Sequence, residues 1–207
     1  NYIHHNYITK SGLPVYEHVL GAVSGAWWHT NTCTDGTPNG YAIFTVKNNS
    51  VDNFVYKPVE LDENYQMRVY NGSQKYTGSK KLTYGWPEEY HGCFIADVFN
   101  DDAENWKVEF IQNGVATPMT RVTKKLRDWC MFAYFINENG RSPKNTAYHT
   151  GKLHYWTLPA PSGNPAKEKN WEIRATYTVP TSGKVNVYTV NSLQTDFTGF
   201  PATLADE

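Results

Sequence analysis

A strict alternation of apolar and polar side chains runs through residues 171–179 and constrains the fold more than any other feature of this sequence. The apolar positions are Trp171, Ile173, Ala175, Tyr177 and Val179. Because side chains two residues apart share one face of a strand, the segment is predicted to be a half-buried β-strand. The apolar set is expected to face a core, with Glu172 and Arg174 facing solvent.

Shorter alternations of the same kind recur along the chain, with turn sequences between them. They occupy residues 42–46, 65–70, 94–98 and 106–110. The turn pairs are Asn71-Gly72, Asn113-Gly114, Asn139-Gly140 and Ser182-Gly183. Aromatic residues make up 15% of the chain, with 15 Gly and 11 Pro, a composition that favours short strands over helices. We therefore expect a mainly β chain, with an antiparallel β-sandwich over residues 86–197.

Composition suggests a boundary before that sandwich. Residues 77–86 are polar and rich in glycine, so residues 72–85 are expected to form a linker. Residues 1–71 would then form an N-terminal part and residues 86–207 a C-terminal domain. Residues 122–136 fit helical and strand spacing equally well, and their structure stays open.

Charge and hydropathy exclude two classes of partner. The formal net charge is -1 with Lys and Arg scattered, which gives no electrostatic footprint for nucleic acid. No apolar run approaches the roughly 20 residues of a membrane-spanning helix. Cys33, Cys93 and Cys130 are spread singly and are expected to be buried thiols, so cysteine usage does not fix the compartment.

Motifs for catalysis and metal binding are missing from this sequence. Gly21-Ala-Val-Ser24-Gly25 is one residue too long for a nucleophile elbow of the Gly-x-Ser-x-Gly kind. His4 and His5 are adjacent and would point to opposite faces of a strand. The other histidines, His18 and His154 among them, have no Asp or Cys at ligand spacing. No catalytic residue and no metal ligand are assigned.

Four residues are candidates for an interface or for the rim of an active site. Trp27 and Trp28 would face opposite sides of a strand, so one ring can enter a core while the other lines a cleft. Asp35 and Asn39 lie in the turn sequence DGTPNG, where Asp35 can accept backbone hydrogen bonds. Core packing of both rings and a purely structural turn are the competing interpretations.

Several blocks of the sequence resemble the end of bacterial calcineurin-like metallophosphoesterases. They are residues 17–28 (EHVLGAVSGAWW), residues 35–41 (DGTPNGY), Tyr56-Lys57 and residues 65–70 (YQMRVY). Beyond Cys93, residues 96–99, 106–108, 153–156 and 172–176 look like the C-terminal accessory domain of that family. The resemblance implies an Ig-like or jelly-roll-like β-sandwich, preceded by the last strands of the catalytic α/β sandwich.

The same resemblance implies that the chemistry lies elsewhere. Family members hold a dinuclear metal centre whose last ligands form a Gly-His-x-His motif, which would stand just upstream of Asn1. Asn1 opens without Met, and the chain is expected to begin inside a domain. No cofactor is expected in this chain, whose partner would be the missing upstream catalytic domain. The resemblance also points to a periplasmic, cell-surface or secreted location.

Three classes of function remain in competition. The favoured one is the accessory region of a phosphoester hydrolase, inactive by itself. The alternative is a stand-alone β-sandwich that binds carbohydrate or another surface ligand; a complete small enzyme is disfavoured by the missing motifs. Because orphaned strands expose apolar surface, residues 1–57 are also expected to pack on the sandwich or to form a homodimer, with Trp27 or Trp28 at the contact.

Overall fold

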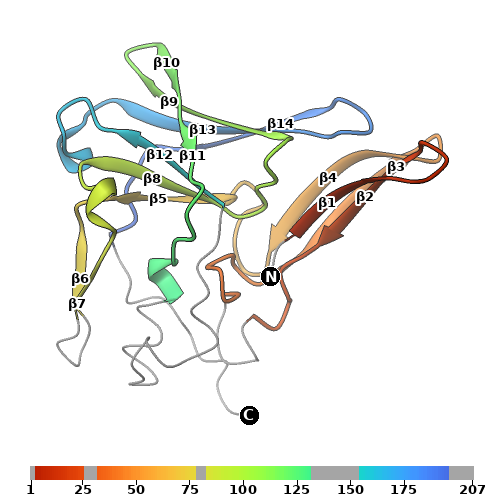
Figure 1. Ribbon diagram of the computed structural model, residues 1–207, viewed down its shortest axis with the longest axis horizontal. Coiled ribbons are helices and arrows are strands. Elements are labelled where there is room, and N and C mark those ends of the chain that lie inside the picture. Colours follow the sequence, from red (N-terminus) through yellow and green to blue (C-terminus); the bar gives the residue numbers. More distant parts are fainter. Residues whose placement is uncertain (1–2, 26–31, 78–82, 132–153, 196–207) are drawn as a thin grey trace.

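The computed structural model describes residues 3–25, 32–77, 83–131 and 154–195, and it is built almost entirely of antiparallel strands (Figure 1). The mainly β fold class predicted from the sequence is confirmed. Trp27, Trp28 and the Asn139-Gly140 turn lie outside the described residues. Within the described ranges, no helix has the length and apolar character to cross a membrane.

Two four-stranded sheets form the sandwich. One has the order β10 (Val115–Pro118), β9 (Trp106–Gln112), β13 (Trp171–Thr178), β14 (Val185–Val190). The other has the order β11 (Thr120–Arg121), β12 (Tyr155–Pro159), β8 (Cys93–Val98), β5 (Met67–Asn71). We call them the β13 sheet and the β8 sheet. Their facing side chains form the main core, where the ring of Phe94 lies 4.9 Å from that of Phe110 and 4.8 Å from that of Trp171.

Strand β13 confirms the alternation that dominates the sequence. It lies between β9 and β14, and its register with β9 runs from Trp171 opposite Gln112 to Tyr177 opposite Trp106. Ile173 is fully buried while Glu172 is only half-buried. The Asn113-Gly114 turn between β9 and β10 has positive φ at both residues, as a tight hairpin requires.

The β8 sheet differs from the half-buried strands expected from its sequence, because β5 and β8 are buried on both faces. Residues 119–131 cross the second face and bring a separate aromatic cluster with them. In that cluster Trp86 stacks on Trp129 at 5.4 Å between ring centroids. The described part of the open segment 122–136 is irregular until Trp129, where a helical turn begins, and Cys130 is buried as expected.

Two hairpins form a layer beside the sandwich, which we call the hairpin layer (Figure 1). β1 (Ile3–Ile8) pairs with β2 (Pro14–Val19), and β3 (Gly40–Lys47) pairs with β4 (Ser50–Pro58). Asn48 and Asn49 join β3 to β4 with positive φ at both positions. Within the described residues each hairpin is a sheet of only two strands.

Short elements complete the described chain. They are the hairpin β6 (Lys75–Thr77) and β7 (Thr83–Gly85) and the 3₁₀ turns η1 (Glu88–Tyr90) and η4 (Pro165–Lys167). All three cysteines are buried and free, as expected. Strand β5 was expected in the N-terminal part, yet it pairs along its whole length with β8. The division into domains at residues 72–85 remains a prediction.

Candidate functional site

Exposed apolar side chains gather on the hairpin layer. Among the described residues, the large exposed hydrophobic side chains between residues 7 and 46 are Tyr7, Ile8, Leu13, Val15, Val19, Val23, Tyr41, Ile43, Phe44 and Val46. The rest of the described chain adds Leu61, Val115, Val185 and Val187. A monomer that folds around its own core exposes such side chains singly, so a gathering over two adjacent hairpins marks a contact surface.

The outer faces of both hairpins carry this apolar surface. Tyr7 on β1 lies directly opposite Val15 on β2, and both are about half exposed. On β3, Tyr41 and Ile43 are 47% and 43% exposed. We call these two surfaces the outer hairpin faces. Among the described strands none extends either hairpin, so backbone edges are open there too.

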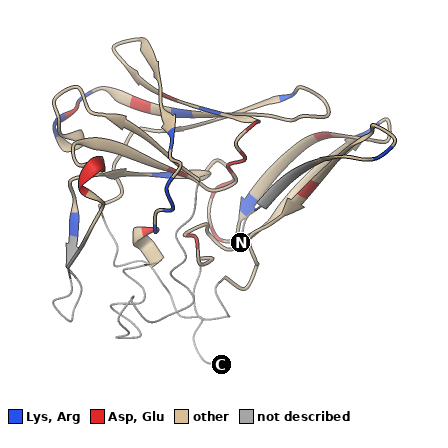
Figure 2. Ribbon diagram, viewed as in Figure 1, with Lys and Arg blue, Asp and Glu red and all other residues tan. Residues whose placement is uncertain are grey.

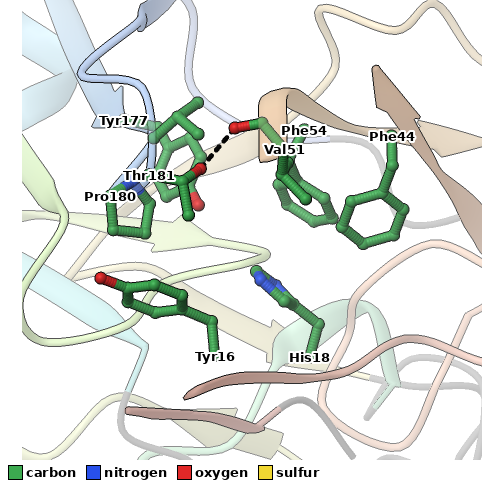
Figure 3. A pocket seen from close by; sticks show the side chains of 9 residues that line it. Tyr16, His18, Phe44, Val51, Phe54, Tyr177, Pro180 and Thr181 are labelled. Carbon is green, nitrogen blue, oxygen red and sulfur yellow. Dashed lines mark hydrogen bonds between the residues drawn. The ribbon is translucent and has the colours of Figure 1, made fainter. Parts of the chain in front are cut away.

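The inner side of the hairpin layer encloses a pocket against the sandwich (Figure 3). Its volume is about 370 Å³. The lining residues are Tyr16, His18, Phe44, Val51, Phe54, Tyr177, Val179, Pro180 and Thr181. They come from β2, β3, β4, and from β13 with the turn that follows it, so the pocket exists only where the hairpins meet the sandwich.

Aromatic rings form most of the wall of this pocket. The ring of Phe54 lies 4.9 Å from that of His18, 5.1 Å from that of Phe44 and 5.9 Å from that of Tyr177. The Thr181 hydroxyl donates to the Val51 carbonyl and fastens the turn after β13 to the start of β4 (Figure 3). The aromatic wall is therefore fixed by both ring contacts and a hydrogen bond.

The lining of the pocket carries no formal charge at neutral pH. Its only titratable group near that range is His18, whose pKa is lowered by burial, against the opposing charge of Asp102. The imidazole is therefore neutral at pH 7. Over the rest of the described ribbon, acidic and basic residues are interspersed (Figure 2).

The turn that holds Asp35 and Asn39 is buried and tightly bonded. Asp35 is 2% exposed, and its Oδ1 accepts a hydrogen bond from the Thr37 backbone N–H at 3.1 Å. Asn39 donates through Nδ2 to the Val23 carbonyl at 2.8 Å. Gly36 has φ of 88°, which suits glycine. The structural turn weighed in the sequence is present, and a place for Asp35 and Asn39 at an active-site rim or interface stays a prediction.

A buried polar network ties this turn to the β8 sheet. Arg68 on β5 donates to the Gly36 carbonyl and forms an ion pair with Asp128 at 3.7 Å, with both side chains fully buried. The Tyr70 hydroxyl donates to the Asp128 carboxylate at 2.6 Å. A Cβ on Gly36 would lie 2.1 Å from the Asp128 Cγ, so the turn fits against the network without spare room.

The sequence gave no sign that His154 has an acidic partner. Its Nδ1 lies 2.6 Å from Asp97 Oδ1, although the two residues are 57 positions apart. Burial by itself lowers the pKa of His154, but the Asp97 carboxylate outweighs it and raises that pKa. Burial also raises the pKa of Asp97, against the opposing charge of His154. Only the pairing of β12 with β8, opposite at Tyr155 and Asp97, brings the two side chains together.

The described residues do not fit a dinuclear metal centre. Within the ranges that the structure describes, no three His, Cys, Asp or Glu side chains are grouped so that they could hold one metal ion. Asp97 and His154 are committed to each other, and Asp128 to Arg68 and Tyr70. No hydrolytic step is therefore derived from these side chains.

Comparison with known proteins gives one result. A family model described as the C terminal of calcineurin-like phosphoesterase matches residues 17–180, which is well over half of the chain. The matched range runs from within β2 past the end of β13, so it includes both the hairpin layer and most of the sandwich. The chain has no significant match among the curated proteins, and none among the solved structures.

Proposed function

We infer the function from one premise: this chain belongs to the family of C-terminal regions of calcineurin-like phosphoesterases. We propose that it is the accessory region of a phosphoester hydrolase and that its outer hairpin faces pack against the catalytic module. The family assigns the hydrolytic chemistry to a dinuclear metal centre, which activates a water and binds the phosphoryl oxygens. This chain would supply scaffold and surface around that centre.

The observation that carries the proposal is the apolar surface of the outer hairpin faces. Tyr41 and Ile43 on β3, with Tyr7 and Val15 on the β1–β2 hairpin, are each between 43% and 49% exposed. Burying such side chains contributes about 25 cal/mol for each Å² removed from water. The sandwich leaves these faces uncovered, because its contacts with the hairpins run through Phe54, on the inner side. A further sheet or helix layer is the partner that such faces fit.

The proposal is tested by comparing two proteins from the same gene, the 207-residue chain and a longer chain that includes the catalytic module. We expect the longer chain to hydrolyse p-nitrophenyl phosphate or a bis-ester with added Mn²⁺ or Zn²⁺, and the 207-residue chain to show no turnover. Multiple turnovers by the 207-residue chain that a chelator abolishes would contradict the proposal.

The docking surface is tested in the longer chain by Ile43→Asp, with Val115→Asp as the matched control. Val115 is 65% exposed on β10 of the sandwich, away from the hairpins. We expect Ile43→Asp to split one cooperative melting transition into two and to open the hairpins to proteolysis. Val115→Asp should leave both readouts unchanged. Equal behaviour of the two variants would remove the outer hairpin faces from the proposal.

A homodimer through residues 1–57 would cover the same faces and is the competing occupant. Light scattering of the 207-residue chain separates the two, because a second copy predicts a dimer that Ile43→Asp dissociates. The docking proposal expects a monomer, or a dimer that the longer chain does not form. A stable dimer of the longer chain, broken by Ile43→Asp, would assign the faces to a second copy.

A further inference from the structure

We propose that the pocket between the hairpin layer and the sandwich binds one pyranose ring of an uncharged glycan. This site is separate from the outer hairpin faces, because its lining residues on β2 and β3, Tyr16, His18 and Phe44, alternate with the outward-facing Val15, Glu17 and Ile43. The inference stands whether or not those outer faces hold a catalytic module.

The size and shape of the pocket suit a single ring. Its volume of about 370 Å³ lies at the lower end of the roughly 300–1,000 Å³ typical of ligand sites. Phe54, Tyr177 and Val179 are at most 3% exposed and form its floor. Phe44, 42% exposed, and the exposed Thr181 lie at its mouth. A long oligomer would have to extend outward past Phe44, so only one ring is held inside.

Opposed walls of the pocket offer aromatic faces to such a ring. Figure 3 shows Tyr16 and His18 on one side, with Phe44, Phe54 and Pro180 across from them. The C–H-rich faces of a pyranose pack against aromatic rings in the way that other apolar surfaces do. Bulk apolar contact alone would equally suit a lipid chain or a partner's aromatic side chain, so the polar groups decide between them.

Polar groups lie among the rings, as recognition of sugar hydroxyls requires. Within the described residues the Tyr16 hydroxyl makes no hydrogen bond, so it can both donate and accept. The Thr181 oxygen donates to Val51 and keeps lone pairs that can accept. The neutral imidazole of His18 offers one donor and one acceptor. A lipid chain would leave these groups unpaired, and an anionic sugar would find no cation in the lining.

The test is a binding titration of the 207-residue chain with methyl glycosides of glucose, galactose and mannose, followed by NMR. We expect at least one glycoside to shift resonances of Tyr16, Phe44 and Thr181 with a Kd of about 10 mM or tighter. p-Cresol serves as the purely aromatic probe and methyl glucuronide as the anionic one.

Three variants make the assignment specific. Phe44→Ala should weaken glycoside binding by about 10-fold or more, because it removes one wall. Tyr16→Phe keeps the ring and the packing and should weaken it by about 3- to 10-fold through the lost hydroxyl. Tyr41→Ala is the control, since Tyr41 is on the same strand as Phe44, similarly exposed and on the opposite face. It should leave the affinity unchanged.

Four outcomes would overturn the proposal. They are no glycoside shift at these residues, a shift with p-cresol but with no glycoside, tighter binding of the glucuronide than of the neutral sugars, and equal loss in Tyr41→Ala and Phe44→Ala. Because Tyr16→Phe leaves the core intact, unchanged glycoside affinity in that variant would also count against it.

Discussion

The sandwich and the hairpin layer are built from the same kind of strand, yet only the sandwich closes. In β13 the apolar positions Ile173 and Ala175 are fully buried between two sheets. In β3 the corresponding alternation leaves Tyr41 and Ile43 about half exposed. Both strands have a paired neighbour and a well-formed turn, so the difference lies in what covers them.

This difference shows that local pattern specifies a strand and its faces, but not its burial. A two-stranded hairpin is marginal in water unless a third strand or a second layer supports it. Here the support reaches β4 from the sandwich. Ser182 donates to the Asp52 carbonyl at 2.7 Å, and Asn186 Nδ2 donates to Asn53 Oδ1 at 2.9 Å. The inner side of the hairpin layer is therefore held, while the outer hairpin faces wait for a partner.

The largest effect should separate a core ring from an outer-face side chain. Phe94 is fully buried between the two sheets, so Phe94→Ala should lower the free energy of unfolding by about 3–5 kcal/mol. Ile43→Ala should change it by about 0.5 kcal/mol or less. Urea denaturation of the 207-residue chain measures both. Similar losses would mean that the outer faces are part of a closed core.

The next effect concerns the contact between the Asp35 turn and the sandwich. Gly36→Ala combines a strained positive φ with a clash against Asp128, and should destabilise the chain by about 2–4 kcal/mol. Gly12→Ala is the matched control, because Gly12 has φ of 79° and nothing within 4 Å of an added Cβ. Its cost should be about 1 kcal/mol. Thermal melting of the two variants that gave the same shift would show that the turn is not packed on the network.

Neither close approach could be predicted from the sequence. The strand at residues 171–178, the Asn113-Gly114 turn and the buried cysteines follow from periodicity and residue type, which act locally. Arg68 alternates with apolar neighbours and reads as a solvent-facing residue, but it is 2% exposed because residues 119–131 and the Asp35 turn cover that face. No local signal links Arg68 to Asp128, or Asp97 to His154, since their contact depends on sheet order.

The pocket was hidden for the same reason. Phe44 was predicted to share one face of a strand with Ala42 and Val46, as β3 confirms near its start. A shift in register between Thr45 and Val46 ends the regular pairing with β4. The second wall comes from Tyr177 and Thr181, more than a hundred residues later. Only the tertiary fold places these groups around one cavity.

A pH dependence should belong to the sandwich alone. Burial raises the pKa of Asp101 to about 6, against the opposing charge of Arg121, and the pKa values of Asp97 and His154 are raised as well. A group whose folded pKa is raised stabilises the native state below its unfolded pKa and loses that effect as pH rises through the folded value. Stability should therefore fall between about pH 6 and 8, by roughly 1 kcal/mol per pH unit.

Thermal unfolding across this pH range measures the effect, and Asp97→Asn should flatten the slope because it removes one titrating group and the charge that raises the pKa of His154. Stability that increased from pH 6 to 8 would contradict the assignment. Proteolysis of the hairpins, followed at the same pH values, should show no matching change.

The smallest effect on stability should come with a visible effect on solubility. Val15→Ser on β2 replaces a 45% exposed side chain and should change the free energy of unfolding by no more than about 0.5 kcal/mol. It should nevertheless raise the solubility of the 207-residue chain, because an apolar face loses area. Val108→Ser on β9, where the side chain is 1% exposed, is the contrasting change and should destabilise the fold. Precipitation thresholds and urea midpoints together make the comparison.

The distance in sequence between paired strands has a consequence for synthesis. β3 and β4 are joined by Asn48 and Asn49 and can pair within microseconds of leaving the ribosome. β9 must wait for β13, and the Thr181 hydroxyl that holds Val51 arrives 130 residues after it. At ordinary translation rates that interval is roughly 10 s. Throughout it the nascent hairpins present both of their faces to the cell, so the demand for chaperones during translation falls on the earliest strands of this chain.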